Sequence, residues 1–265
     1  MNTQLQAVSL PGVEIPYFRF GREGGRPMLL LPGLSLANVM EFADAVVDGY
    51  AVFSAAFDVY VMERPLEVPQ GVTIRGLAAV TAQALDTLGL TGLDVMGVSQ
   101  GGMIAQELTL LRPDLVRSLV LGSTAARTPA SSKELIAGWM TLAEQRDPAA
   151  LLEAFAQAVY TPSFYEQYRE ALTTPYRPIA DEEFVRFRRL AAAVTTFDAA
   201  ERLKEIRVPA LVMEAGCDRV FPAGTSEELA SLLHADLHIC EGYGHAAYDE
   251  DPAYRKTIVD FLLAH

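Results

Sequence analysis

Short runs of hydrophobic residues recur along the chain, and most are separated by stretches with helical periodicity. A run of four to eight apolar residues bounded by turn residues is typical of a strand buried on both faces of a sheet. Leu5–Leu10 and Glu14–Phe20 flank Pro11-Gly12 and predict an N-terminal hairpin. The later runs predict six further strands: Pro27–Leu31, Phe57–Met62, Leu93–Gly97, Arg117–Leu121, Pro209–Met213 and Asp236–Cys240.

Helices are expected between these strands. The predicted helices are Ile74–Leu88, Gln100–Leu111, Thr225–His234 and a last helix that opens at Asp251-Pro252. Gly89 ends the first of them, and Thr225 to Glu228 have the spacing of a capping box. Strands that alternate with helices indicate βαβ units. The sequence therefore predicts an α/β fold with a doubly wound, mostly parallel sheet.

Residues 128–200 break this alternation, because they contain helical patterns and no convincing strand. Asp181 to Glu183 are acidic and are followed by Arg186, Arg188 and Arg189, an order that favours a helix. We therefore expect a helical insert at 128–200 within a core made of residues 1–127 and 201–265. The insert holds 10 of the 23 aromatic residues. They either form the insert's own small core or line a pocket above the carboxyl ends of the strands.

Composition limits the possible partners. Hydrophobic residues make up 51% of the 265 residues and charged residues 21%, as in a soluble globular protein. The formal net charge of −13 makes nucleic acid and anionic membranes poor partners. The two cysteines cannot build a disulfide framework, and the N-terminal residues do not resemble a signal peptide. We therefore expect a cytoplasmic protein that acts on a small molecule.

The sequence Gly97-Val98-Ser99-Gln100-Gly101 carries the clearest chemistry. It follows a predicted strand and opens a predicted helix, which is the setting of a nucleophile elbow. At such a tight turn the neighbouring residues must be small, and the serine hydroxyl is exposed above the sheet. The helix N-terminus offers free N–H groups to a developing anion. The alternative is a glycine-rich turn capped by a serine.

In this setting Gly97–Gly102 resembles the α/β-hydrolase superfamily, in particular its serine hydrolases with a helical cap. The resemblance extends over nearly the whole chain, and the insert corresponds to the cap of that family. It implies a catalytic serine at Ser99, and the remaining histidines and carboxylates can be tested against it.

A serine hydroxyl needs a neighbouring base. The four histidines are His234, His238, His245 and His265. His245 is the candidate, because it follows Gly242-Tyr243-Gly244 in a loop after the last strand. Asp218 lies just past the preceding strand, where the resemblance places the acid that orients the base. Glu214 lies within that strand and is less well placed.

The resemblance also implies an oxyanion hole made by two backbone N–H groups. Gln100 follows the nucleophile and would supply one, and Leu34 in the loop after Pro27–Leu31 would supply the other. Pro32-Gly33 stands where the family has His-Gly, and Glu63-Arg64-Pro65 replaces another family stretch. Because of these departures, the substrate class of the better-known branches of the family does not transfer to this chain.

The sequence contains no metal-binding motif and no nucleotide-binding fingerprint, so we expect neither a metal nor another cofactor. The combined hypothesis is a serine hydrolase that cleaves a small, largely apolar carboxylic ester through an acyl-enzyme. The same triad could serve a carbon–carbon bond hydrolase, a lactonase, an amidase or an acyltransferase. A receptor-like protein that binds a ligand on this fold is the alternative from another class.

Overall fold

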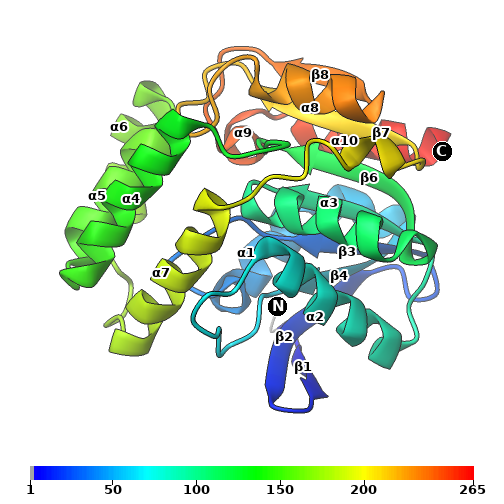
Figure 1. Ribbon diagram of the computed structural model, residues 1–265, viewed down its shortest axis with the longest axis horizontal. Helices are drawn as coiled ribbons and strands as arrows, with labels where there is room; N and C mark the ends of the chain where they lie inside the picture. The colour runs from blue at the N-terminus through cyan, green and yellow to red at the C-terminus, as the bar shows by residue number, and fades with distance from the viewer. Residues whose placement is uncertain (1–2) are drawn as a thin grey trace.

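An eight-stranded sheet lies at the centre of the protein, and its strands coincide with the hydrophobic runs of the sequence. The computed structural model describes residues 3–265. The strands are β1 (Leu5–Leu10), β2 (Val13–Gly21), β3 (Arg26–Leu31), β4 (Phe57–Met62), β5 (Leu93–Val98), β6 (Val116–Gly122), β7 (Ala210–Ala215) and β8 (Asp236–Cys240). Their order is β1-β2-β4-β3-β5-β6-β7-β8; β2 pairs antiparallel with β1 and β4, and all other pairs are parallel. The predicted fold class is confirmed (Figure 1).

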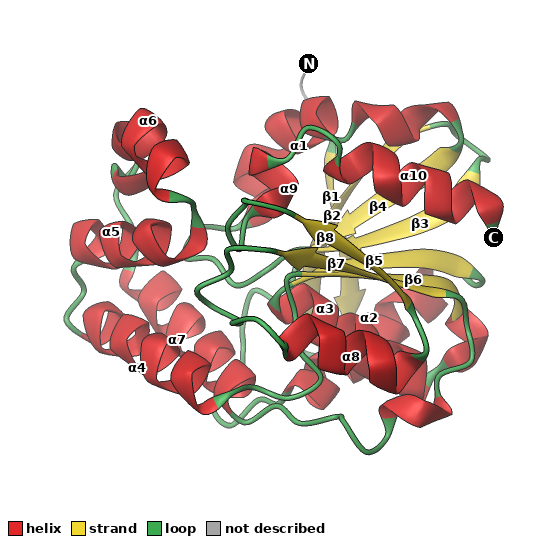
Figure 2. Cartoon of the chain, turned by 90° about the horizontal axis from the view of Figure 1, so that it is seen from above, coloured by secondary structure: helices red, strands yellow, loops and turns green. Residues whose placement is uncertain are grey.

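Helices cover both faces of this sheet. The flanking helices are α1 (Ala43–Gly49), α2 (Ile74–Leu88), α3 (Gln100–Leu111), α8 (Thr225–Leu233), α9 (Ala247–Glu250) and α10 (Tyr254–Ala264), with short 3-10 helices η1 (Val39–Phe42), η2 (Ala51–Ala55), η3 (Pro113–Leu115) and η4 (Leu203–Glu205). Figure 2 shows α2, α3 and α8 on one face, and α1 and α10 on the other.

Successive side chains of a strand point to opposite faces, and the core is divided accordingly. On β3, Leu29 and Leu31 belong to the apolar cluster that includes α2, α3 and α8, whereas Met28 and Leu30 belong to the cluster that includes α10. The continuous apolar run of β3 is thus explained by burial on both faces.

The boundaries of α2 and α3 agree with the sequence. The last helix was predicted to open at Asp251-Pro252, but α10 begins at Tyr254 with Ala253 as its N-cap. Gly89 ends α2 in the left-handed conformation, at φ 66°. The predicted capping box of α8 is wrong, because Gly224 precedes the helix and offers no side chain to cap it. The Thr225 hydroxyl instead donates to the carbonyl of Pro222 (2.6 Å).

Four helices occupy the chain between β6 and β7. They are α4 (Ala130–Glu144), α5 (Pro148–Val159), α6 (Pro162–Thr173) and α7 (Asp181–Thr195), and we call residues 128–200 the insert. They lie together beside the sheet (Figure 2). Arg127 and Asp198 form an antiparallel bridge, so the two ends of the insert leave the core side by side. Within residues 3–265, no helix has both the length and the apolar character needed to span a membrane.

Candidate active site

Ser99 lies at a strained turn between β5 and α3. Its φ is 53°, a left-handed value that is unusual for a residue with a side chain. A Cβ atom on Gly97 would lie 2.3 Å from the carbonyl oxygen of Gly101, and a Cβ atom on Gly101 would lie 2.0 Å from that of Leu31. Only glycine fits at these two positions. The spacing of small residues around Ser99 therefore follows from the close approach of β3, β5 and α3.

Asp218 and His245 lie together although 27 residues separate them. Asp218 follows β7 and His245 follows β8, and Nδ1 of His245 is 2.8 Å from Oδ2 of Asp218. The other carboxylate oxygen of Asp218 accepts hydrogen bonds from the backbone N–H groups of Val220 (2.7 Å) and Phe221 (2.8 Å). Both side chains are almost fully buried. The carboxylate is thus fixed by its own loop and directed at the imidazole.

The loop that carries His245 packs against the insert. The backbone N–H of Ala246 donates to the carbonyl of Val159 at the end of α5 (3.0 Å). A Cβ atom on Gly244 would lie 2.8 Å from that same carbonyl oxygen, so only glycine fits at this position. The imidazole also packs against the ring of Phe221, at 5.6 Å between ring centroids. Gly244, one of the two glycines on which the prediction of His245 relied, allows this close approach.

The other candidate bases and acids lie elsewhere. His234 follows α8 in the left-handed conformation, His238 lies on β8, and His265 is the last residue. The strand β8 was expected to be buried, but it is the edge strand and most of its residues are exposed. Glu214 lies within β7. Burial raises the pKa of Glu214, and the charges of neighbouring carboxylates raise it further.

Ser99 and His245 line one pocket between the core and the insert. The pocket encloses about 30 Å³, or about 410 Å³ when the open space at its mouth is included. Its wall consists of Gly33, Leu34, Ser99, Ile136, Trp139, Phe155, Val159, Val194, Val220, Phe221, His245 and Tyr248. No aspartate, glutamate, lysine or arginine is among these described residues. The site therefore favours an uncharged group next to Ser99.

Two backbone N–H groups are available beside Ser99. Gln100 is the first residue of α3, so its N–H has no acceptor within the helix. Leu34 lies in the β3–η1 loop (residues 32–38) and lines the pocket. Within residues 3–265, neither N–H donates a hydrogen bond. A Cβ atom on Gly33 would lie 3.3 Å from Cβ of Ser99, which shows how closely the β3–η1 loop approaches the serine.

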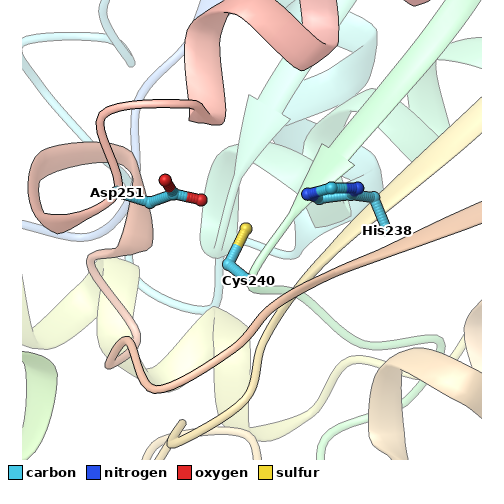
Figure 3. Close-up of side chains that lie close together, drawn as sticks. All are labelled: His238, Cys240 and Asp251. Carbon is cyan, nitrogen blue, oxygen red and sulfur yellow. The ribbon is translucent and has the colours of Figure 1, made fainter.

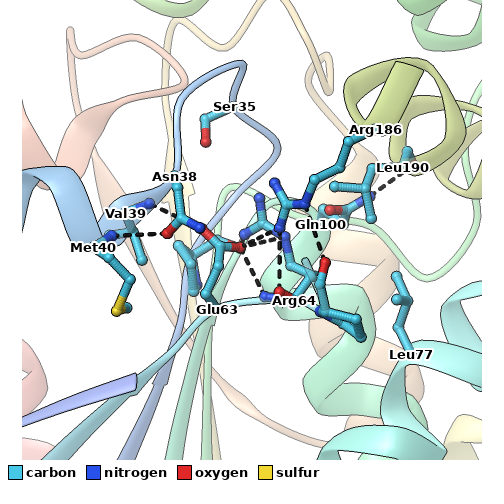
Figure 4. Close-up of polar contacts among 12 residues, drawn as sticks. Ser35, Asn38, Val39, Met40, Glu63, Arg64, Leu77, Gln100, Arg186 and Leu190 are labelled. Atoms are coloured by element: carbon cyan, nitrogen blue, oxygen red, sulfur yellow. Dashed lines mark hydrogen bonds and ion pairs between the residues drawn. The ribbon is translucent and has the colours of Figure 1, made fainter. Parts of the chain in front are cut away.

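A buried cluster of charged side chains supports the β3–η1 loop (Figure 4). The Arg64 guanidinium donates to the carbonyl of Pro32 (3.0 Å) at the start of the loop. The Glu63 carboxylate accepts from the N–H of Val39 (2.9 Å), just after the loop. The same carboxylate accepts from Nη2 of Arg186 on α7 (3.1 Å). The cluster therefore connects both ends of the loop to the insert.

In this cluster two guanidinium groups surround one carboxylate. Burial alone would raise the pKa of Glu63, but the guanidinium groups of Arg64 and Arg186 outweigh it and hold the pKa below its ordinary value. Burial lowers the pKa of Arg64 to about 10, which still leaves the guanidinium charged at neutral pH. Glu63 is therefore an anion between two cations. Removing Arg186 would leave Glu63 paired with Arg64 but would break the contact of this carboxylate with the insert.

The sequence alone does not assign this role to these residues. In the sequence, Glu63-Arg64 is a departure from the family and Arg186 is part of a helix-favouring charge pattern. A Glu-Arg pair directly after a buried strand was the available signal, since such charges must find partners. The side chain of Gln100 was also missed. Its amide donates to the carbonyl of Leu190 on α7 (2.8 Å), and this hydrogen bond connects α3 to the insert.

Known proteins resemble this chain over most of its length. It is 29% identical over 208 residues to the protein named "Putative carbamate hydrolase RutD" from Pseudomonas savastanoi pv. phaseolicola (strain 1448A / Race 6), with 76% of this chain and 79% of the relative covered. The structure of MGS-M2, an alpha/beta hydrolase enzyme from a Medee basin deep-sea metagenome library, is 20% identical, with a TM-score of 0.86 and 97% of both chains covered.

The enol-lactonase from Burkholderia xenovorans LB400 has a similar structure. It is 24% identical, with a TM-score of 0.83 and 97% of this chain and 100% of the enol-lactonase covered. The sequence model of the alpha/beta hydrolase family matches residues 28–254, and this range includes the elbow at Ser99, Asp218 and His245. The protein is a hydrolase enzyme, and its chain belongs to the alpha/beta hydrolase family.

Proposed function

We propose that the protein is a serine hydrolase that cleaves a small, largely apolar carboxylic ester, or a related acyl compound, through an acyl-enzyme. One observation carries the proposal: Ser99 and His245 line the same uncharged pocket, and His245 is held by Asp218 at 2.8 Å. A binding pocket alone has no need of an imidazole with a buried carboxylate behind it. This arrangement is what a serine nucleophile requires.

The first half of the reaction forms the acyl-enzyme. Asp218 accepts the Nδ1 proton of His245, so Nε2 is free to accept the proton of the Ser99 hydroxyl. The serine oxygen attacks the carbonyl carbon, and the carbonyl oxygen becomes an anion. The N–H groups of Leu34 and Gln100 then donate to that anion. His245 returns the proton to the leaving alcohol as the carbon–oxygen bond breaks.

The second half releases the acid. A water molecule gives a proton to His245 and attacks the acyl carbon, again through an anion bound by the two N–H groups. The bond to the serine oxygen breaks, and His245 returns its proton to Ser99. Each step uses groups of this chain alone. Cys217 and Cys240 are both free thiols, in line with the reducing, cytoplasmic setting that we propose.

The pocket wall supports an uncharged, apolar acyl group. Ile136, Trp139 and Phe155 come from the insert, and each would contact a substrate attached to Ser99. The relatives named as a carbamate hydrolase and an enol-lactonase both act, by their names, on a carbonyl bonded to a heteroatom. A lactone or a carbamate is therefore a closely related substrate class to test beside open-chain esters.

The decisive experiment measures product acids from a panel of esters, lactones, amides and carbamates whose acyl groups increase in size. The panel is run in water and with an added alcohol, because transfer to the alcohol identifies an acyltransferase. We expect turnover of uncharged esters or lactones that falls to background in Ser99→Ala. Turnover that is equal in the wild type and in Ser99→Ala would overturn the proposal. Fast acylation of Ser99 without release would indicate a receptor-like protein.

A further inference from the structure

A second cluster of reactive side chains lies at the edge of the sheet, away from the pocket wall. His238 and Cys240 are two residues apart on β8, so they share one face of the strand. Cys240 belongs to the core cluster that includes α10, which identifies that face as the one α10 covers. Asp251 follows α9 and precedes α10 on the same side (Figure 3).

The ligand-type atoms of these three residues converge. A ring nitrogen of His238, Sγ of Cys240 and a carboxylate oxygen of Asp251 all lie within 4.8 Å of one another. Cys240 is 1% exposed and Asp251 is 7% exposed, while His238 is partly exposed. Figure 3 shows the three side chains directed toward a common point. His238 is therefore the member of the cluster that is most accessible to solvent.

We propose that His238, Cys240 and Asp251 form a binding site for a divalent transition-metal ion, with Zn²⁺ as the ion that fits best. Nitrogen, thiolate sulfur and carboxylate oxygen are the three donor types that zinc takes from proteins. Zinc bonds of about 2.0–2.3 Å place tetrahedral donors roughly 3.3–3.8 Å apart. Small side-chain rotations would close the present cluster to that size, with the fourth position left to water.

Charge and hydrogen bonding agree with a divalent cation. A thiolate and a carboxylate together balance two positive charges, which suits a buried position. Binding to the thiol exchanges one proton for the metal: the S–H bond breaks, the sulfur–metal bond forms and the proton goes to solvent. One oxygen of Asp251 accepts from the N–H of Ala253 (2.8 Å), which orients the carboxylate.

The position of this cluster gives it a structural consequence. Cys240 ends β8 and Asp251 follows α9, so a metal ion bound to both would join the two ends of the segment 241–250. That segment includes His245. The proposed ion would therefore stabilise the loop that carries the base without contacting the reacting atoms.

The test uses the full-length protein, freed of metal by a chelator and titrated with Co²⁺, which reports its ligands by absorption. We expect one ion per chain, with a thiolate-to-cobalt charge-transfer band and visible bands of a four-coordinate site. Zn²⁺ should displace Co²⁺, whereas Mg²⁺ should not, because it prefers oxygen ligands. Cys240→Ser and His238→Asn should each weaken binding at least tenfold and should abolish or alter the charge-transfer band.

Matched controls are present in the same chain. Cys217→Ser removes the other, exposed thiol, and His234→Asn removes a histidine outside the cluster; both should bind metal like the wild type. Zn²⁺ should raise the Tm of the wild type and slow amide hydrogen exchange in residues 241–250, but not in Cys240→Ser. Absence of stoichiometric binding, or an unchanged cobalt spectrum in Cys240→Ser, would overturn the proposal. Neither outcome bears on whether Ser99 is the nucleophile.

Discussion

The insert contacts the core on two sides of Ser99, and the two sets of contacts use different kinds of interaction. On the side of the base, the turn between α5 and α6 meets the loops that follow β7 and β8. The N–H of Ala246 donates to Val159, and the Arg219 guanidinium donates to the carbonyl of Tyr160 (2.6 Å). On the side of the oxyanion donors, α7 is attached through the buried contact between Arg186 and Glu63.

This difference predicts different responses to mutation. The oxyanion side depends on an anion enclosed between two guanidinium groups, so a lost partner should cost both stability and geometry. The base side lies near the edge of the sheet, where Arg219, Asp249 and Glu250 form hydrogen bonds with the turn between α5 and α6. None of these contacts is an ion pair. A change of charge there should cost catalysis with little loss of stability. The predictions below test this contrast, from the largest expected effect to the smallest.

Asp218→Asn should produce the largest loss of activity. The asparagine oxygen should replace the carboxylate oxygen that accepts from Val220 and Phe221, because only an acceptor fits there. The NH2 group then faces Nδ1 and favours the imidazole tautomer that cannot act as a base toward Ser99. In a serine triad this change lowers kcat on the order of 10⁴-fold. The Tm should stay within a few degrees of the wild type. Activity close to the wild type would assign the acid to another residue. It would also contradict the expectation that a change of charge on the base side costs catalysis.

Arg186→Met should lower kcat by about 10- to 100-fold on a small ester, with little change in KM. Loss of the guanidinium removes the contact between α7 and Glu63, and the β3–η1 loop with its Leu34 donor can then shift. A displacement of about 1 Å can cost 10²-fold in rate. The free energy of unfolding should fall by about 2 kcal/mol, as expected when a buried carboxylate loses one charge-assisted hydrogen bond but keeps Arg64 as a partner. Steady-state kinetics and urea unfolding measure the two effects.

Arg188→Met is the matched control for that variant. Arg188 lies on the same helix and pairs with Glu144 at the surface (3.1 Å), so its loss should change both quantities little.

The pH dependence of stability adds a further check. Arg64 and Arg186 lower the pKa of Glu63, so the stability that these ion pairs contribute is present above the ordinary glutamate pKa and is lost as the pH falls. Acid unfolding should therefore begin at a higher pH in Arg186→Met; identical behaviour of the two variants would contradict the contrast.

Trp139 should affect substrate choice more than chemistry. Its ring lines the pocket and lies 4.6 Å from that of Phe155, between centroids. Trp139→Ala should raise KM for a hexanoyl ester about tenfold and leave the reaction with an acetyl ester within about threefold. Trp139→Phe keeps much of the ring but removes the indole N–H, which has no hydrogen-bond partner among the described residues. Equal losses with both esters would show that the insert acts on the chemistry instead.

Glu214→Gln should have the smallest effect. The side chain lies within β7, and burial raises its pKa, so its ionised form opposes folding. Stability of the wild type should therefore fall as the pH rises through that raised pKa, and the glutamine variant should lack this loss. At neutral pH we expect wild-type activity and a Tm about 1–3 °C higher. A large loss of activity would identify Glu214 as the acid in place of Asp218.

Much of the sheet could be predicted because its information is local. Strands such as β3 and β5 are apolar on both faces, and turn residues bound them. The elbow at Ser99 could also be predicted from a short segment. Gly97 and Gly101 are required there because the tight turn brings backbone atoms too close for a side chain. The segment between β3 and β4 was not predicted, because η1, α1 and η2 are short and have weak periodicity. The exposure of β8 was missed because edge position depends on strand order.

The support of the oxyanion side could not be predicted for a different reason. Glu63 and Arg186 are 123 residues apart, and their contact exists only when α7 lies over the end of β4. The acidic residues 181–183 do begin α7, as the charge pattern indicated. The same pattern gave Arg186 a role along its own helix, whereas the structure shows a partner on the core. Long-range charge pairs leave no local pattern, so they appear only with the fold.

The most direct test of the proposed nucleophile is the reaction of the protein with a fluorophosphonate probe. Phosphonylation of a serine requires an exposed hydroxyl, a base within reach and N–H donors for the phosphonyl oxygen. We predict one probe per chain, attached to Ser99 as mapped by mass spectrometry of peptides. Labelling should be absent in Ser99→Ala and strongly slowed in Asp218→Asn. Attachment at another residue, or undiminished ester turnover in Ser99→Ala, would contradict the assignment of Ser99.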